Sequence, residues 1–170
     1  MKIIVQKYGG TSVGSIEKIK QIATNIKKLK KLQIVVVVSA MAGETDRLVG
    51  LINSLSKITN EREYDQIIST GERVSAGLLA LALQSINVKS ITLDPFKLNL
   101  LTDNLHSKAS IISVDVKEIR KNLKNNHVVI IPGFQGINSD NEITTLGRGG
   151  SDLSAVAIAG ALKADRCELL

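Results

Sequence analysis

The sequence predicts an α/β fold, a three-layer αβα sandwich in which helices cover both faces of a mainly parallel central sheet. Three observations predict it. Runs of Ile and Val at residues 3–5, 34–38 and 128–131 are continuous rather than alternating, which is typical of strands buried on both faces. Segments with apolar residues at helical spacing separate these runs. Aromatic residues make up only 2% of the chain, so aliphatic side chains have to form the core.

The first elements form a strand–helix–strand unit. Residues 2–7 are expected to be a short buried strand, which Gly9 and Gly10 bring to an end. A helix is expected to begin after Ser15, which can cap it, and to run to residue 29. Residues 34–38 are β-branched and form the next strand. The crossover in such a unit is right-handed, which makes the two strands parallel.

The rest of the chain alternates between helices and strands. Helices are expected near residues 47–58 and 64–85, with Gly71 interrupting the second, and strands at 88–93 and 127–131. The stretch 94–113 is expected to be mostly loop with a short strand. A helix at 114–125, a loop at 144–150, a helix at 152–164 and a last strand near Cys167 complete the pattern. The sequence shows no internal repeat or linker, which predicts one domain.

The composition excludes several classes of protein. The net charge is +6, but lysines in helical segments most often mark a solvated face, and single-strand nucleic-acid binders need stacking aromatic residues that are scarce here. The single cysteine, Cys167, excludes an internal disulfide and a cysteine metal cluster. No apolar run reaches the roughly 18 residues that a membrane span needs. The first strand breaks too early for a signal peptide, so a cytoplasmic protein without nucleic-acid or membrane partners is expected.

Ligands of open parallel sheets bind beyond the carboxyl ends of the strands, where this chain has polar loops. In the first loop, Gly9 and Gly10 let backbone N–H groups approach an anion, and the hydroxyls of Thr11 and Ser12 add donors. Lys7, at the strand end, can neutralise charge on a transferring phosphoryl group. On these residues alone, phosphate binding and a tight turn with an exposed lysine stay equally open.

Two further loops carry polar residues of less specific meaning. Ser39 and Thr45 follow the second strand and can contact a small polar substrate, but Thr45 or Asp46 can also cap the next helix. Glu72 stands near a helix start, where it can receive an ammonium group or complement the helix dipole. Taken alone, both loops favour the capping and dipole interpretations.

The loop from Thr145 to Asp152 is the most informative segment. Glycines surround Arg148, and Ser151 and Asp152 follow at the start of a helix. The planar guanidinium group suits bidentate binding of a carboxylate or a phosphate. A loop that only closes a turn rarely needs this composition, so a functional arginine is favoured.

Together these segments resemble the aspartate kinases of the amino-acid kinase superfamily in order and spacing. The matching segments are 7–13, 38–45, 71–72, 133–136 and 145–152. The resemblance implies that Lys7 and Asp152 are catalytic and that no residue is a dedicated metal ligand. It also implies phosphate binding by Gly9, Gly10, Thr11 and Ser12, and substrate binding by Ser39, Thr45, Glu72, Arg148 and Ser151.

The implied activity is transfer of the γ-phosphoryl group of ATP, bound with Mg²⁺, to the β-carboxylate of L-aspartate. In this resemblance Glu72 accepts the aspartate ammonium group and Arg148 holds its α-carboxylate. The attacking carboxylate, with a reference pKa of about 3.9, is ionised at neutral pH, so no general base is needed. The product, 4-phospho-L-aspartate, leads to lysine, threonine, methionine and diaminopimelate.

The resemblance covers the whole chain but only the first part of the family. The chain is therefore expected to be the N-terminal, substrate-binding portion of the catalytic domain, with the C-terminal part and the regulatory domain missing. The missing C-terminal part holds most of the ATP site. A homo-oligomer or a separate polypeptide is then expected to complete an active enzyme. The alternatives are a catalytically incompetent fragment and a module that binds aspartate without phosphorylating it.

Overall fold

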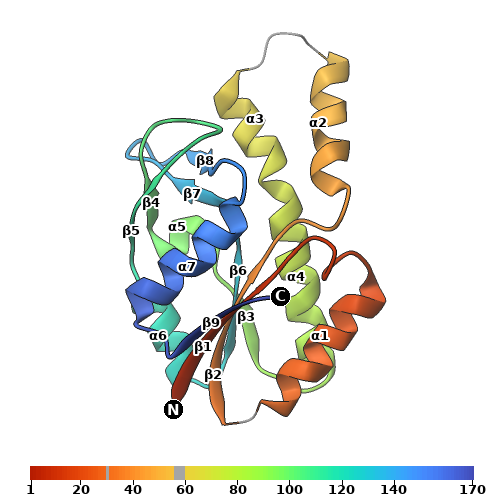
Figure 1. The fold of residues 1–170 in the computed structure, drawn as a ribbon, viewed down its shortest axis with the longest axis vertical. Coiled ribbons are helices and arrows are strands. Elements are labelled where there is room, and N and C mark those ends of the chain that lie inside the picture. Colours follow the sequence, from red (N-terminus) through yellow and green to blue (C-terminus); the bar gives the residue numbers. More distant parts are fainter. Residues whose placement is uncertain (30, 56–59) are drawn as a thin grey trace.

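The computed structural model describes residues 1–29, 31–55 and 60–170. Their central element is a five-stranded sheet in the order β3-β6-β2-β1-β9, in which every pair of neighbours is parallel (Figure 1). The strands are β1 (Lys2–Tyr8), β2 (Leu32–Val38), β3 (Ser90–Thr92), β6 (Val128–Pro132) and β9 (Arg166–Leu169). The predicted parallel sheet is therefore confirmed.

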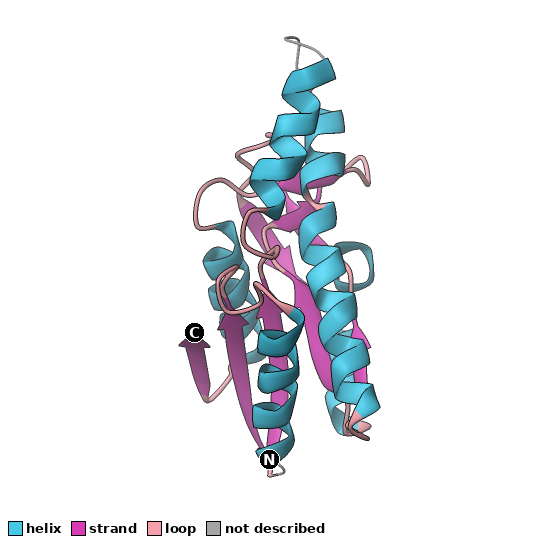
Figure 2. Ribbon diagram, turned by 90° about the vertical axis from the view of Figure 1, so that its right-hand side faces the viewer, coloured by secondary structure: helices cyan, strands magenta, loops and turns pink. Residues whose placement is uncertain are grey.

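Helices cover both faces of this sheet. One face carries α1 (Ile16–Lys28) and α4 (Thr70–Ser85), which lie in front of the strands in Figure 2. The other face carries α5 (Pro95–Leu98), α6 (Lys117–Lys124) and α7 (Gly150–Leu162). In β2, Val36 and Val38 join the first core, whereas Val35 and Val37 join the second. This alternation explains why the strand is apolar at every position and confirms the three-layer sandwich.

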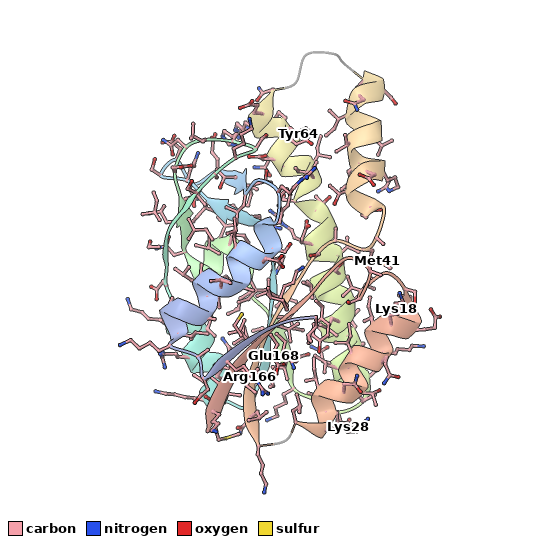
Figure 3. All side chains as sticks on the ribbon, in the orientation of Figure 1. Lys18, Lys28, Met41, Tyr64, Arg166 and Glu168 are labelled. Carbon is pink, nitrogen blue, oxygen red and sulfur yellow. The ribbon has the colours of Figure 1, made fainter. Side chains whose placement is uncertain are left out.

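The β1–α1–β2 unit forms as expected. Ser15 caps α1, because its hydroxyl accepts a hydrogen bond from the Lys18 N–H at 3.3 Å. Lys18 and Lys28 are exposed along the outer side of α1, as Figure 3 shows. Part of the positive charge of the chain is therefore a solvated helix face, as the sequence predicts.

A second, four-stranded sheet was not expected. It has the order β5-β4-β7-β8 and contains β4 (Leu100–Thr102), β5 (Ile111–Val114), β7 (Gln135–Ile137) and β8 (Ile143–Thr145). The predictions of mostly loop at 94–113 and of loop from residue 144 are thus wrong in part. These strands have three or four residues, which is too few to show a periodic pattern. In addition, β4 pairs with β7, which is distant in the sequence.

Several element boundaries also differ from the predictions. The α2 helix spans Glu44–Leu55 and begins before residue 47, while its predicted end at residue 58 lies outside the described residues. The break in the following helical segment falls at Ser69, between α3 (Glu61–Ile68) and α4, and not at Gly71. The helix predicted from Val114 begins at Lys117, because Val114 pairs with β4.

The α2 and α3 helices lie side by side and project beyond the sheet at the top of Figure 1. None of the described helices is both long and apolar enough to cross a membrane.

Candidate active site

A cavity of about 380 Å³ lies beyond the carboxyl ends of β1 and β2. The four polar loops singled out in the sequence all contribute to its lining, together with the segment before β7. Eight of the predicted site residues line it: Lys7, Gly10, Ser39, Thr45, Glu72, Arg148, Ser151 and Asp152. The edge of the sheet at which the strands end therefore brings together residues that are far apart in the sequence.

Three predicted phosphate-binding residues do not line the cavity. The Gly9 N–H and the Ser12 hydroxyl both donate to the carbonyl oxygen of Leu170, at 3.1 and 3.3 Å. Thr11 is exposed, and its carbonyl oxygen accepts a hydrogen bond from Lys18 Nζ at 2.9 Å. Gly9 and Ser12 therefore contact the residue after β9, and Gly10 alone of the predicted glycine pair lines the cavity.

Lys7 ends in the cavity as an ion pair with Asp152. Its Nζ atom lies 2.8 Å from Asp152 Oδ1, and the two side chains are 15% and 47% exposed. Lys7 comes from the end of β1 and Asp152 from the first turn of α7, so the pair joins this strand to this helix. The ion pair holds the Lys7 ammonium group in place, and this group has three N–H donors, so it keeps donors for a ligand.

The first two loops approach each other closely at Gly10. A Cβ atom at this position would lie 2.9 Å from the carbonyl oxygen of Ala40, and the Ala42 N–H donates to the Gly10 carbonyl oxygen at 3.1 Å. A side chain would push the loops apart, so glycine is required here for contact between backbones.

Glu72 is a buried carboxylate in the first turn of α4 and is 4% exposed. Its Oε1 atom accepts a hydrogen bond from the Ala40 N–H at 3.1 Å, while Oε2 is buried without a hydrogen-bond partner among the described residues. Burial raises the pKa of the Glu72 carboxyl to about 7, because it disfavours the charged form. A cationic ligand in the cavity would favour ionisation and satisfy the free oxygen.

Arg148 lies in the exposed turn between β8 and α7. Within the described part of the chain, it has no carboxylate at ion-pair distance, so its guanidinium group is available to a ligand. The turn depends on its glycines: Gly149 has a φ of +76°, and a Cβ atom on Gly150 would lie 2.8 Å from the Phe134 ring. Backbone geometry therefore sets where the arginine stands.

The sequence did not single out some of the lining residues. Met41, labelled in Figure 3, belongs to the loop after β2, and Phe134 precedes β7. Phe134 has a φ of +70°, an unusual backbone conformation for an aromatic residue. The only signal for Phe134 was its place in the matching segment 133–136. No group of three or more His, Cys, Asp and Glu residues among those described is arranged to hold a metal ion.

Comparison with known proteins places these features in a family. The model of the amino acid kinase family matches residues 2–170. The chain is 48% identical over 171 residues to the aspartokinase of Pseudomonas aeruginosa, which covers 99% of this chain and 42% of that protein. The crystal structure of aspartate kinase from Synechocystis superposes with a TM-score of 0.82 at 47% identity, over 98% of this chain and 28% of that chain.

A second solved structure shares the same arrangement. Aspartokinase III of E. coli, in complex with lysine and aspartate, superposes with a TM-score of 0.86 at 25% identity, over 99% of this chain and 49% of that chain. The chain thus spans less than half the length of these relatives and corresponds to their amino-terminal part. On the family match and on this fold, the chain belongs to the amino acid kinase family.

Proposed function

We propose that this chain is the aspartate-binding portion of an aspartate kinase. The proposed reaction transfers the γ-phosphoryl group of ATP to the β-carboxylate of L-aspartate and yields 4-phospho-L-aspartate. One observation carries the proposal: the same cavity is lined by the buried acid Glu72, the available guanidinium group of Arg148 and the cation Lys7. This reaction requires an acceptor for an ammonium group, a donor for a carboxylate and a cation that stabilises a phosphoryl group.

The amino-acid substrate is proposed to bind through its charged groups. Glu72, with one free oxygen, receives the ammonium group, and Arg148 binds the α-carboxylate through two parallel hydrogen bonds. Ser39, Thr45 and Ser151 line the same cavity and offer hydroxyl groups to the remaining polar atoms. Because both charges of the α-amino acid are matched, the β-carboxylate is the group left to react.

The chemical step is proposed to need positioning and charge stabilisation only. An ionised oxygen of the β-carboxylate forms a bond to the γ-phosphorus atom, and the bond from that atom to the bridging oxygen breaks, with the electron pair leaving on ADP. Lys7 stabilises the charge on the transferring group, and Asp152 holds the Lys7 ammonium group in place through the 2.8 Å ion pair. Mg²⁺ brought with ATP would supply further neutralisation of the phosphate charge.

The proposal extends to residues and partners outside the cavity. Phosphate binding by Gly9, Thr11 and Ser12 stays a prediction that would require phosphates to reach beyond the cavity toward β9. L-aspartate and ATP are the proposed small-molecule partners, and the cytoplasm is the proposed location. Residues 1–170 are proposed to act with the remainder of a catalytic domain, in the same or another polypeptide or in a homo-oligomer.

The test is production of acyl phosphate by the full-length protein. The purified protein is incubated with ATP, Mg²⁺ and L-aspartate, and the product is trapped as the hydroxamate. We expect a signal that is absent without aspartate and is reduced to the blank level in Lys7→Ala. If no hydroxamate forms even when the polypeptide that completes the catalytic domain is present, the proposed kinase activity is refuted. Aspartate binding in that case, measured by calorimetry, would identify a binding module instead.

A further inference from the structure

Asp65 is a buried carboxylate that does not line the proposed active site. It lies on α3, is 0% exposed, and both its oxygen atoms are occupied by hydrogen bonds. Thr145 donates from its N–H at 3.0 Å and from its hydroxyl at 2.6 Å. Ser107 donates from its N–H at 3.0 Å and from its hydroxyl at 3.3 Å, and His106 Nδ1 lies at 2.9 Å. One side chain therefore joins α3 to β8 and to the loop before β5.

The chemistry of these contacts requires a carboxylate. The backbone N–H groups of Thr145 and Ser107 can only donate, and they approach both oxygens of Asp65. An amide side chain would turn its NH₂ group toward at least one of these donors. The surroundings of Asp65 thus require a hydrogen-bond acceptor at both Oδ1 and Oδ2. A side chain that only filled space would not need two acceptors.

Asp65 also connects the elements that carry the two charged residues proposed to bind aspartate. On its own side, α3 leads through Ser69 into the first turn of α4, which carries Glu72. On the other side, Thr145 is the last residue of β8 and precedes the turn that carries Arg148. The contacts of Asp65 therefore couple the elements from which these two side chains project.

A second contact supports the same junction. The buried Gln135 side chain donates to the Ser69 carbonyl oxygen at 3.0 Å and accepts from Arg73 Nε at 3.1 Å. Gln135 pairs with Thr145 across β7 and β8. Within the described chain, the N–H groups of Gly147, Arg148 and Gly149 make no backbone hydrogen bond, so the turn depends on its two ends for its position.

We propose that Asp65 is a positioning residue that fixes the separation of Glu72 and Arg148 in the proposed aspartate site. It does so by anchoring Thr145, and with it the upstream end of the Arg148 turn, to the helix that leads into Glu72. The identity of the ligand in this inference rests on the proposed function, whereas the anchoring of the turn does not.

The test removes one donor and keeps the shape of the side chain. Thr145→Val loses the hydroxyl hydrogen bond to Asp65, and Thr145→Ser retains it. Thr102→Val is the matched control, because Thr102 is equally buried in the same sheet and its hydroxyl bonds Thr144 at 2.6 Å, away from Asp65. Two quantities are measured on the full-length protein: the aspartate dissociation constant, and hydrogen exchange of the peptide that spans residues 143–150.

We expect Thr145→Val to weaken aspartate binding about tenfold, the lower end of the effect of losing a hydrogen bond to a charged group. Exchange in the Arg148 turn should be faster in this variant. Thr145→Ser and Thr102→Val should retain the wild-type affinity and exchange in that turn. Asp65→Asn, assayed in turnover, should raise the KM for aspartate while leaving the KM for ATP unchanged.

The contrary outcomes are distinct. Wild-type affinity and exchange in Thr145→Val would overturn the proposal, as would equal effects of Thr145→Val and Thr102→Val, which would indicate general loosening of the sheet. If Thr145→Val does not fold, equal KM changes for both substrates in Asp65→Asn would overturn it. If the wild-type protein does not bind aspartate, the proposed function fails, and the exchange data alone decide whether Asp65 positions the turn.

Discussion

At the scale of single residues, Glu72 and Arg148 each keep hydrogen-bonding capacity that no described residue uses, Glu72 as a buried group and Arg148 as an exposed one. Among residues 1–29, 31–55 and 60–170, Glu72 Oε2 has no hydrogen-bond partner and Arg148 has no carboxylate at ion-pair distance. An unsatisfied buried polar group destabilises a fold by about 1–3 kcal/mol, so such groups are rare away from sites where a ligand supplies the missing contact. Their opposite charges match the two charged groups of an α-amino acid.

Replacing Arg148 tests the carboxylate side of this match. We expect Arg148→Ala to weaken aspartate binding about a hundredfold, because charge-assisted and bidentate hydrogen bonds are lost. The aspartate affinity of Arg148→Lys should lie between those of the wild-type protein and Arg148→Ala, since lysine keeps the charge but not the planar guanidinium group. The melting temperature should stay unchanged because the side chain is exposed. Calorimetric titration with L-aspartate measures the effect, and unchanged affinity in Arg148→Ala would remove this residue from the site.

Replacing Lys7 separates binding from chemistry. In Lys7→Ala we expect kcat to fall about 100- to 1,000-fold, as for other removed groups that stabilise transition-state charge, while the aspartate affinity changes little. Lys28→Ala is the matched control, because Lys28 is an exposed lysine at the far end of α1. Hydroxamate formation gives kcat, and calorimetry gives the affinity. A variant with full turnover would exclude a phosphoryl-stabilising role for Lys7.

The raised pKa of Glu72 predicts that the proposed aspartate binding depends on pH. Because only the ionised carboxylate attracts the ammonium group, affinity should increase as pH rises from 5.5 and level off above about 7, where Glu72 is ionised. Below that pKa the change approaches tenfold per pH unit. Glu72→Gln should bind weakly and without this dependence. Titrations at several pH values measure it, and a flat wild-type profile between pH 5.5 and 7 would contradict the role of Glu72.

At the scale of elements, the central strands β1, β2 and β6 were predictable because each contains a continuous apolar run. Because these strands were predicted to be parallel, the residues at and after their ends, including Lys7, Ser39 and the polar loops, were predicted to lie at one edge of the sheet. The second sheet was not predictable, since β4, β7 and β8 are short and the pairing of β4 with β7 joins segments distant in sequence. Asp65 was missed for a similar reason: a single aspartate in a helix carries no local signal of the contacts it makes.

Two glycines of α4 test how tightly this helix must approach the loop after β2. A Cβ atom on Gly71 would lie 2.8 Å from the Ala40 Cβ, whereas a Cβ atom on Gly77 would meet no atom of the described residues within 4 Å. We expect Gly71→Ala to destabilise the protein by about 1–3 kcal/mol and to weaken aspartate binding, because the neighbouring Glu72 moves with the helix. Gly77→Ala should stabilise it by about 0.5–1 kcal/mol.

Urea unfolding and aspartate titration of both variants measure these effects. The same substitution in the same helix should thus have opposite effects on stability. Destabilisation of similar size in both variants would mean that the close approach at Gly71 has no special role.

At the scale of the whole molecule, the site depends on both sheets. Lys7 and Ser39 come from strand ends of the central sheet, whereas Arg148 stands on the turn that leaves the second sheet. The motifs made the residues of the site predictable, because each lies in a loop of distinctive composition. Their separation was not predictable, since it is set by Asp65, Gln135 and the glycines that allow backbones to touch.

The burial of Glu72 should also appear in the stability of the unliganded protein. The pKa of its carboxyl is about 7 in the folded state against an ordinary value of 4.5, so folding favours the protonated form. The contribution of this group to stability is fully present below pH 4.5 and is lost as pH rises through about 7.

The comparison is with Glu72→Gln, whose side chain stays neutral. Relative to this variant, the free energy of unfolding of the wild-type protein should fall by on the order of 3 kcal/mol across this pH window and then remain constant. Urea unfolding of both proteins between pH 4.5 and 8.5 measures this difference, in which the titration of other groups cancels. A stability difference that stays constant with pH would mean that the folded protein solvates the Glu72 carboxylate as well as water does. Saturating aspartate should restore the stability lost at high pH only if its ammonium group binds to Glu72.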